Sequence, residues 1–219
     1  MSLASRVLVI ALFGVVLSAL GGGGGHAHPV SADPRVSPFM RVYGPTLPPF
    51  GFVSFCERHP KECRQGSLEE ARLELTPERL DELDHVNRSV NRLIEPATDQ
   101  EIYGVAEYWA IPMNRGDCED YALLKRQVLM MRGWPASALL LTVVRDEKGE
   151  GHAILTARTA KGDFILDNKV DDLKSWHATG YTYIMRQSYI DPKVWVSLDS
   201  RHGRSPDLLA GVRSDRSRR

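Results

Sequence analysis

The chain has 219 residues, of which 42% are hydrophobic and 26% charged, with 28 basic and 28 acidic side chains. These fractions are typical of a globular protein and exclude wholesale disorder, collagen-like repeats and a multi-span membrane protein. The balanced charge gives no basic bias that would indicate a nucleic-acid partner. A chain of this length can form one domain with a sizeable core, or at most two small ones.

Residues 1–27 have the features of a secretory signal peptide. Arg6 precedes an apolar run of 14 residues that ends in glycines and His26-Ala27. Such a run is shorter than the roughly 20 residues that span a bilayer, although an uncleaved membrane anchor is an alternative. We therefore expect export to the periplasm, with no stable membrane insertion after cleavage.

Export changes how the three cysteines are interpreted. The segment 28–66 is rich in proline, and we expect an extended arm that carries Cys56 and Cys63. In an oxidising compartment these two lie close enough to form a disulfide loop. Cys118 is then left without a partner, and an unpaired thiol in an exported protein is a candidate nucleophile.

Two helices are predicted in the next part of the chain. Thr76 and Pro77 are typical of a helix start, and apolar residues follow at steps of three and four until Pro96. The second helix is expected to begin near Asp117 and to end at Gly133.

After the second helix the hydrophobic pattern changes to that of strands. Lys161-Gly162 is the expected hairpin turn in a group of antiparallel strands. The expected strands are 138–144, 152–158, 163–166, 181–187 and 195–198. The order of helix, helix and sheet predicts an α+β domain with segregated layers over 67–199. The tail, 200–219, carries six arginines and is expected to be disordered.

Three residues have the spacing of a catalytic relay. Cys118 lies at a predicted helix N-terminus, where backbone N–H groups and the helix dipole favour a thiolate. His152 opens one strand and Asp167 ends the next, so a hairpin at Lys161-Gly162 could place them opposite each other. A Cys-His-Asp relay needs such a pair. Taken singly, the three could be a packing cysteine, a polar strand residue and a turn former.

The segment around Cys118, Gly116-Asp117-Cys118-Glu119-Asp120-Tyr121-Ala122, resembles the bacterial transglutaminase-like cysteine peptidase family. The segments that begin at Gly151 and Ile165 are similar to that family's His and Asp motifs. The resemblance covers roughly 80–190 and implies a papain/transglutaminase-like fold, with the Cys-bearing helix packed on an antiparallel β-sheet. It implies Cys118 as nucleophile, His152 as general base and then acid, and Asp167 as the group that orients His152.

The best-known members of this family are periplasmic, calcium-dependent proteases that clip large surface adhesins and so release cells from biofilm. The resemblance therefore implies a protein or peptide substrate, possibly an adhesin. The family's calcium site uses acidic residues beside the cysteine, and Asp117, Glu119 and Asp120 match those positions. Three adjacent carboxylates repel one another, and a hard cation would relieve that repulsion. Alternatively, they only complement the helix N-terminus.

These observations favour an exported cysteine endopeptidase that acts through a thioacyl-enzyme. Two alternatives stay open: a transglutaminase-type acyl transfer to an amine, and a catalytically silent, calcium-dependent peptide-binding module. A second oxyanion donor besides the Cys118 backbone N–H is not assigned. Trp109 is a candidate for it, with a core aromatic as the alternative.

Overall fold

The computed structural model describes residues 36–64 and 72–201. The predicted signal peptide, 1–27, lies outside the described residues, as does nearly all of the predicted tail.

The centre of the fold is a sheet of seven strands in the order β1-β9-β8-β4-β5-β6-β7, in which all neighbours are antiparallel. Five of its strands overlap the predicted ones. The strands are β1 Gly44–Thr46, β4 Leu139–Arg145, β5 Gly151–Thr159, β6 Gly162–Leu166, β7 Lys174–Ser175, β8 Thr182–Gln187 and β9 Trp195–Ser197. Short 3₁₀ helices, Ala136–Ala138 and Trp176–Ala178, lie before β4 and β8.

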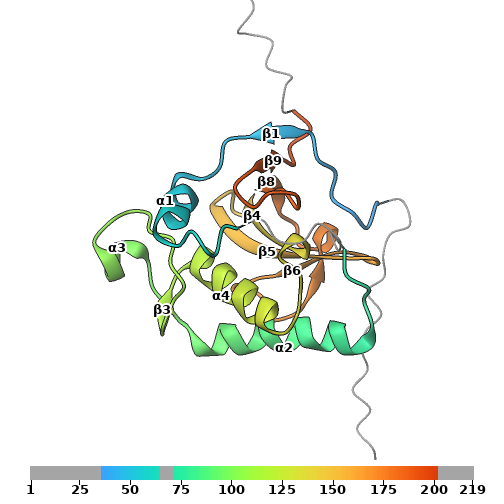
Figure 1. The fold of residues 1–219 in the computed structure, drawn as a ribbon, viewed down its shortest axis with the longest axis horizontal. Helices are drawn as coiled ribbons and strands as arrows, with labels where there is room; N and C mark the ends of the chain where they lie inside the picture. The colour runs from blue at the N-terminus through green and yellow to red at the C-terminus, as the bar shows by residue number, and fades with distance from the viewer. Residues whose placement is uncertain (1–35, 65–71, 202–219) are drawn as a thin grey trace, which may run out of the picture.

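The two predicted helices are present. Helix α2, Pro77–Leu93, begins after Thr76, whose hydroxyl accepts a hydrogen bond from the Arg79 N–H. Helix α4, Cys118–Met131, is followed by Gly133 at φ 87°, a left-handed conformation that favours glycine. Helix α4 packs on the sheet with α2 beside it (Figure 1).

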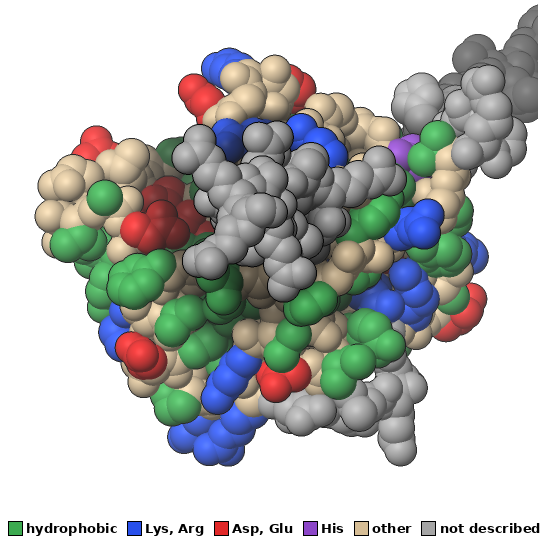
Figure 2. All heavy atoms as spheres, turned by 90° about the horizontal axis from the view of Figure 1, so that it is seen from above, with side chains coloured by type: hydrophobic (Ala, Val, Ile, Leu, Met, Phe, Trp, Pro, Cys, Tyr) green, Lys and Arg blue, Asp and Glu red, His purple; other side chains and the backbone are tan. Residues whose placement is uncertain are grey.

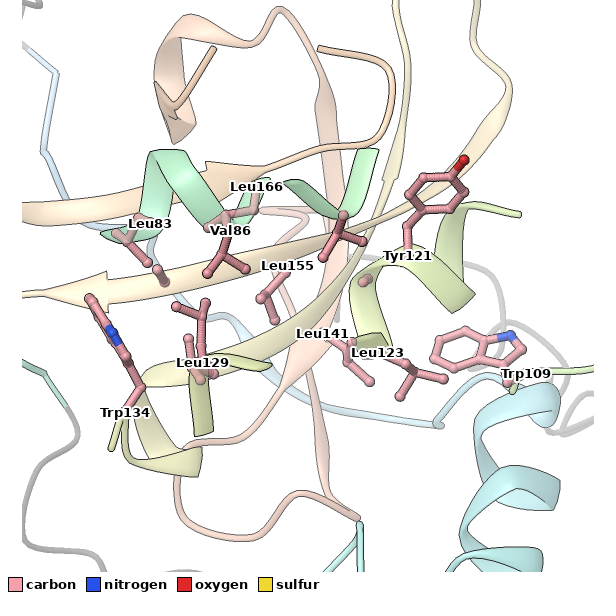
Figure 3. Packing of buried hydrophobic residues seen from close by; sticks show 14 of the residues in the cluster. Leu83, Val86, Trp109, Tyr121, Leu123, Leu129, Trp134, Leu141, Leu155 and Leu166 are labelled. Carbon is pink, nitrogen blue, oxygen red and sulfur yellow. The ribbon is translucent and has the colours of Figure 1, made fainter. Parts of the chain in front are cut away.

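The main core lies between these two helices and one face of the sheet (Figure 3). Leu83 of α2, Leu129 of α4 and Leu155 of β5 are all completely buried. Burial of side chains of this size contributes about 1.5–3 kcal/mol each relative to exposure. The predicted α+β class, with the Cys-bearing helix packed on an antiparallel sheet, is confirmed.

The segment expected to be an extended arm contains a helix that was not predicted from the sequence. Helix α1, Phe50–Arg58, buries Phe52 and Phe55 in the main core. The Phe52 ring lies edge-on to Trp109 and Trp195, with centroids 5.7 and 5.3 Å apart. Because these aromatic contacts come from distant parts of the chain, local composition did not reveal them.

Cys56, in α1, and Cys63 form the predicted disulfide. Replacing both with serine should lower the free energy of unfolding by about 2.5 kcal/mol, since the bond closes only a short loop in the unfolded chain. Urea denaturation would measure this loss, and wild-type protein under dithiothreitol should show the same loss. A double variant as stable as the oxidised wild type would contradict the expectation.

Three short elements lie between α2 and α4. They are a parallel pair of two-residue strands, β2 Glu95–Pro96 and β3 Arg115–Gly116, and helix α3, Asp99–Tyr103. None of them was predicted from the sequence. Together they hold the chain that leads into Cys118 beside the start of α3. The face seen in Figure 2 mixes hydrophobic side chains with both signs of charge.

Candidate active site

Cys118 is the first residue of α4, and only the N-cap residue Asp117 separates it from strand β3. Only glycine fits at position 116, because the Asp120 side chain lies close to the backbone there. A Cβ at this position would lie 2.7 Å from an Asp120 side-chain oxygen. The Cys118 sulfur accepts a hydrogen bond from the Ala153 backbone N–H at 3.4 Å and donates one to Glu119 Oε2 at 3.2 Å. The sulfur therefore lies against the backbone of β5, at the residue that follows His152.

His152 and Asp167 form a buried pair. His152 Nε2 lies 2.8 Å from Asp167 Oδ1, and the two residues are only 3% and 4% exposed. Asp167 Oδ1 also accepts from the Lys169 backbone N–H at 2.9 Å, and Oδ2 accepts from the Tyr181 hydroxyl at 2.6 Å. The Asp167 contact on Nε2 leaves Nδ1 as the ring nitrogen free to face another group.

The register predicted for the hairpin is wrong. Strands β5 and β6 pair from Leu155 opposite Leu166 to Thr159 opposite Gly162, so the turn is Ala160-Lys161 and not Lys161-Gly162. The paired ladder ends at Leu166. Asp167 comes just after it and reaches His152 through its side chain. Gly162, at φ 144°, opens β6 in a conformation that favours glycine, which sets the turn earlier than predicted.

Helix α2 holds the loop that carries Asp167. Asn91 Nδ2 donates to the Asp167 carbonyl at 2.9 Å, and Asn87 Nδ2 donates to the carbonyls of Val170 and Asp171. The buried Lys125 of α4 donates to Asn87 Oδ1 at 2.8 Å. These asparagines were not predicted from the sequence. One sequence feature could have indicated them: Asn87 is a polar residue at a position of α2 that otherwise carries apolar, core-facing side chains.

Three carboxylates gather beside Cys118. Oxygens of Asp99, Asp117 and Glu119 lie within 4.8 Å of one another. Of the three acidic residues predicted to bind calcium, Asp117 and Glu119 belong to this cluster. Asp120 is outside it, and its Oδ1 accepts from the Ala110 N–H at 2.7 Å. Asp99 was not predicted, because it comes from helix α3, which local sequence signals did not indicate.

Residues 42–203 match the family model described as bacterial transglutaminase-like cysteine proteinase. The chain belongs to this family. The predicted resemblance is confirmed, and the protein is a cysteine peptidase.

Among solved structures, the calcium-bound form of LapG from Legionella pneumophila is similar to this peptidase at 22% identity and a TM-score of 0.47. The match covers 59% of this chain and 73% of that chain. The EGTA-treated form of LapG is 22% identical with a TM-score of 0.46, over 61% and 73% of the two chains. No curated protein matches the peptidase.

The electrostatic surroundings of the thiol are unfavourable to a thiolate. The pKa of Cys118 is raised well above its ordinary value, first by burial and then by the neighbouring Glu119. Burial and the charge of Asp117 raise the pKa of Glu119, and burial raises the pKa of Asp120 to about 8. Burial first, and then the neighbouring acidic residues, thus favour the protonated form of the thiol.

The donor set fits a hard divalent cation such as calcium. Within the described residues, three buried carboxylate oxygens have no hydrogen-bond partner: Asp99 Oδ1, Asp117 Oδ1 and Asp120 Oδ2. Buried, unpaired anionic oxygens are costly, and calcium binds oxygen ligands of this kind.

Trp109 is part of the main hydrophobic core of the peptidase. Its indole N–H donates to Glu107 at 2.6 Å, and the residue is 3% exposed. Its single donor is therefore engaged away from Cys118, and the structure favours the core-aromatic interpretation over an oxyanion role.

Proposed function

We propose that the protein is an exported cysteine endopeptidase that cleaves a protein substrate through Cys118, His152 and Asp167. Family membership gives the reaction class. The observation that carries the assignment of residues is the buried 2.8 Å pair between His152 Nε2 and Asp167. The Cys118 thiol, at a helix N-terminus, accepts a hydrogen bond from the residue that follows His152.

In the first half of the proposed reaction, Asp167 holds the His152 ring with a proton on Nε2, so that Nδ1 can accept the proton of Cys118. Among the described hydrogen bonds the thiol donates to Glu119, so it must turn from Glu119 toward His152 before reaction. The thiolate then attacks the substrate carbonyl carbon. His152 returns the proton to the leaving amine, which leaves a thioacyl-enzyme.

In the second half, His152 removes a proton from a water molecule that attacks the thioacyl carbon. The carboxylic acid product leaves, and the proton returns to the Cys118 sulfur. The backbone N–H groups at the start of α4 have no partner within the helix, so they can stabilise the oxyanion formed in each half.

We further propose that Asp117 and Glu119, with Asp99 as a third ligand, hold calcium. Asp120, the remaining predicted ligand, can contribute its unpaired Oδ2 from outside the cluster. Bound calcium supplies positive charge that offsets the carboxylates beside Cys118. The unpaired oxygens of these residues support the assignment.

Export to the periplasm and a large surface adhesin as substrate remain part of the proposal. The Cys56–Cys63 disulfide supports an oxidising compartment. In the described ranges, no helix combines the length and apolar character needed to cross a bilayer.

A peptide library tests this function while the substrate is still unidentified. Proteome-derived peptides with blocked amino groups are incubated with calcium-loaded wild-type protein and, in parallel, with Cys118→Ala. New amino termini should appear at a recurring sequence with the wild type only. Circular dichroism should show the same fold for both proteins.

Two other results would contradict the endopeptidase. In a parallel incubation with an added primary amine, products that have gained the amine and lost one ammonia per bond would indicate acyl transfer. No new termini, together with slow alkylation of Cys118 by iodoacetamide near neutral pH, would indicate a peptide-binding module.

A further inference from the structure

The Asp167 carboxylate is fixed at both of its oxygens by side chains from two different elements. Oδ1 lies 2.8 Å from His152 Nε2 of β5, and Oδ2 accepts the Tyr181 hydroxyl at 2.6 Å. Rotation of the carboxylate would break both contacts. The Tyr181 hydroxyl therefore determines which oxygen faces the imidazole and in which plane.

Tyr181 also contacts the imidazole itself. The two rings are nearly perpendicular, at 86°, with centroids 5.8 Å apart. The Tyr181 ring packs against the smaller hydrophobic cluster on the other side of the sheet, which includes Val144, Ile154 and Ile165. One side chain thus touches both members of the His-Asp pair.

The backbone conformation and hydrogen bonds just before β8 fix the position of Tyr181. Gly180 has φ 77°, a left-handed conformation that favours glycine. The Tyr181 N–H donates to Thr179 Oγ1 at 3.2 Å, and that hydroxyl donates to the Trp176 carbonyl at 3.0 Å. Tyr183, two residues on, donates to the Trp176 carbonyl at 2.9 Å and lies 3.2 Å from Thr179 Oγ1, with no hydrogen bond to Asp167 among the described residues.

Asp167 is held ionised by its donors. Burial by itself would raise its pKa, but the hydrogen bond and charge of His152, with the hydrogen bonds from Tyr181 and the Lys169 N–H, outweigh this and lower the pKa of the carboxyl below its ordinary value. An ionised, oriented carboxylate is what a histidine base needs in order to keep its proton on the nitrogen that faces away from the nucleophile.

We propose that Tyr181 is a positioning residue of the peptidase, which acts through Asp167 to hold the His152 ring in its reactive orientation. The proposal deepens the proposed function and rests on it. It adds a fourth side chain to the relay, contributed by the loop before β8. The hydroxyl of Tyr181 carries the role, and its ring assists by packing edge-on against the His152 ring.

The test compares Tyr181→Phe, which removes only the hydroxyl, with the matched control Tyr183→Phe from the same segment. The full, calcium-loaded protein is labelled with ¹⁵N-histidine. The imidazole N–H resonance of His152 is then assigned by its loss in His152→Ala. We expect this resonance to shift or broaden in Tyr181→Phe and to stay unchanged in Tyr183→Phe.

Acylation of Cys118 by p-nitrophenyl acetate supplies a second readout. In Tyr181→Phe the limiting rate of nitrophenolate release should fall about tenfold, with the half-saturating ester concentration within about twofold of wild type. In Tyr183→Phe both values should remain within about twofold of wild type.

Failure of the proposed function and failure of the role of Tyr181 give different results. Wild-type protein that is not acylated at Cys118 would overturn the proposed function, while the resonance still reports on the contact between Tyr181 and the pair. An unshifted His152 resonance and an unchanged limiting rate in Tyr181→Phe would overturn the role of Tyr181 alone. Equal losses in both variants would also overturn it, since they would indicate a general packing effect.

Discussion

Replacing His152 with alanine is expected to lower the limiting rate of Cys118 acylation by about a thousandfold or more. General acid–base catalysis contributes about 10²–10⁴-fold to rates of this kind, and His152 is the base of the proposed relay. The measurement is nitrophenolate release from p-nitrophenyl acetate at neutral pH. Because His152 is buried, the melting temperature of the variant is compared with that of the wild type in parallel.

Asp167→Asn provides the companion result. The amide keeps the shape of the carboxylate but favours the other tautomer of His152, so the rate should fall by about 10²-fold or more with little change in fold. His85→Ala is the matched control, since His85 is exposed on α2 and, within the described part of the chain, its side chain hydrogen-bonds to Ser89 alone. Retention of acylation within about tenfold of wild type in His152→Ala would leave the proposed relay without its base.

Removing calcium with EGTA is expected to lower both the stability and the acylation rate of the protein. A ligand at about 100 times its dissociation constant stabilises the folded state by about 2.7 kcal/mol. For a domain of this size that corresponds to a rise in melting temperature of roughly 5–10 °C. Differential scanning fluorimetry with calcium, with magnesium and with EGTA would measure it.

Single substitutions identify the ligands. Asp117→Asn and Glu119→Gln should lose the calcium-dependent rise, and Asp99→Asn should lose more of it than Asp120→Asn, because Asp99 lies in the cluster and Asp120 does not. Asp172→Asn, which alters an exposed ion pair with Arg88, should keep the full rise. Calcium that leaves the wild-type melting temperature unchanged would exclude the proposed site.

Cys118 illustrates what could be predicted from the sequence. Its place at a helix N-terminus follows from local signals, since the apolar spacing of α4 and the acidic residues around the cysteine are contained in a short stretch of chain. The same holds for α2, whose start is set by Thr76 and Pro77, and for the order of strands that led to the α+β class.

Asp99 and Tyr181 illustrate what could not be predicted. Asp99 reaches the carboxylates beside Cys118 only because α3 and the β2–β3 pair fold the chain back between two helices. Tyr181 meets Asp167 across strands that are not neighbours in the sheet. The hairpin register also differed from the prediction. The turn ends at Gly162, and Asp167 contacts His152 through its side chain from a position just beyond the paired strands.

The sequence by itself determined the two long helices, α2 and α4, the main strands, the disulfide between nearby cysteines and the family to which the chain belongs. Each of these depends on periodicity, capping or spacing within a few turns of chain. Only the tertiary structure decided which oxygens surround the thiol, which helix anchors the Asp167 loop and which tyrosine holds its carboxylate. Such contacts depend on how the elements pack, and packing is set by the whole core at once rather than by any single segment.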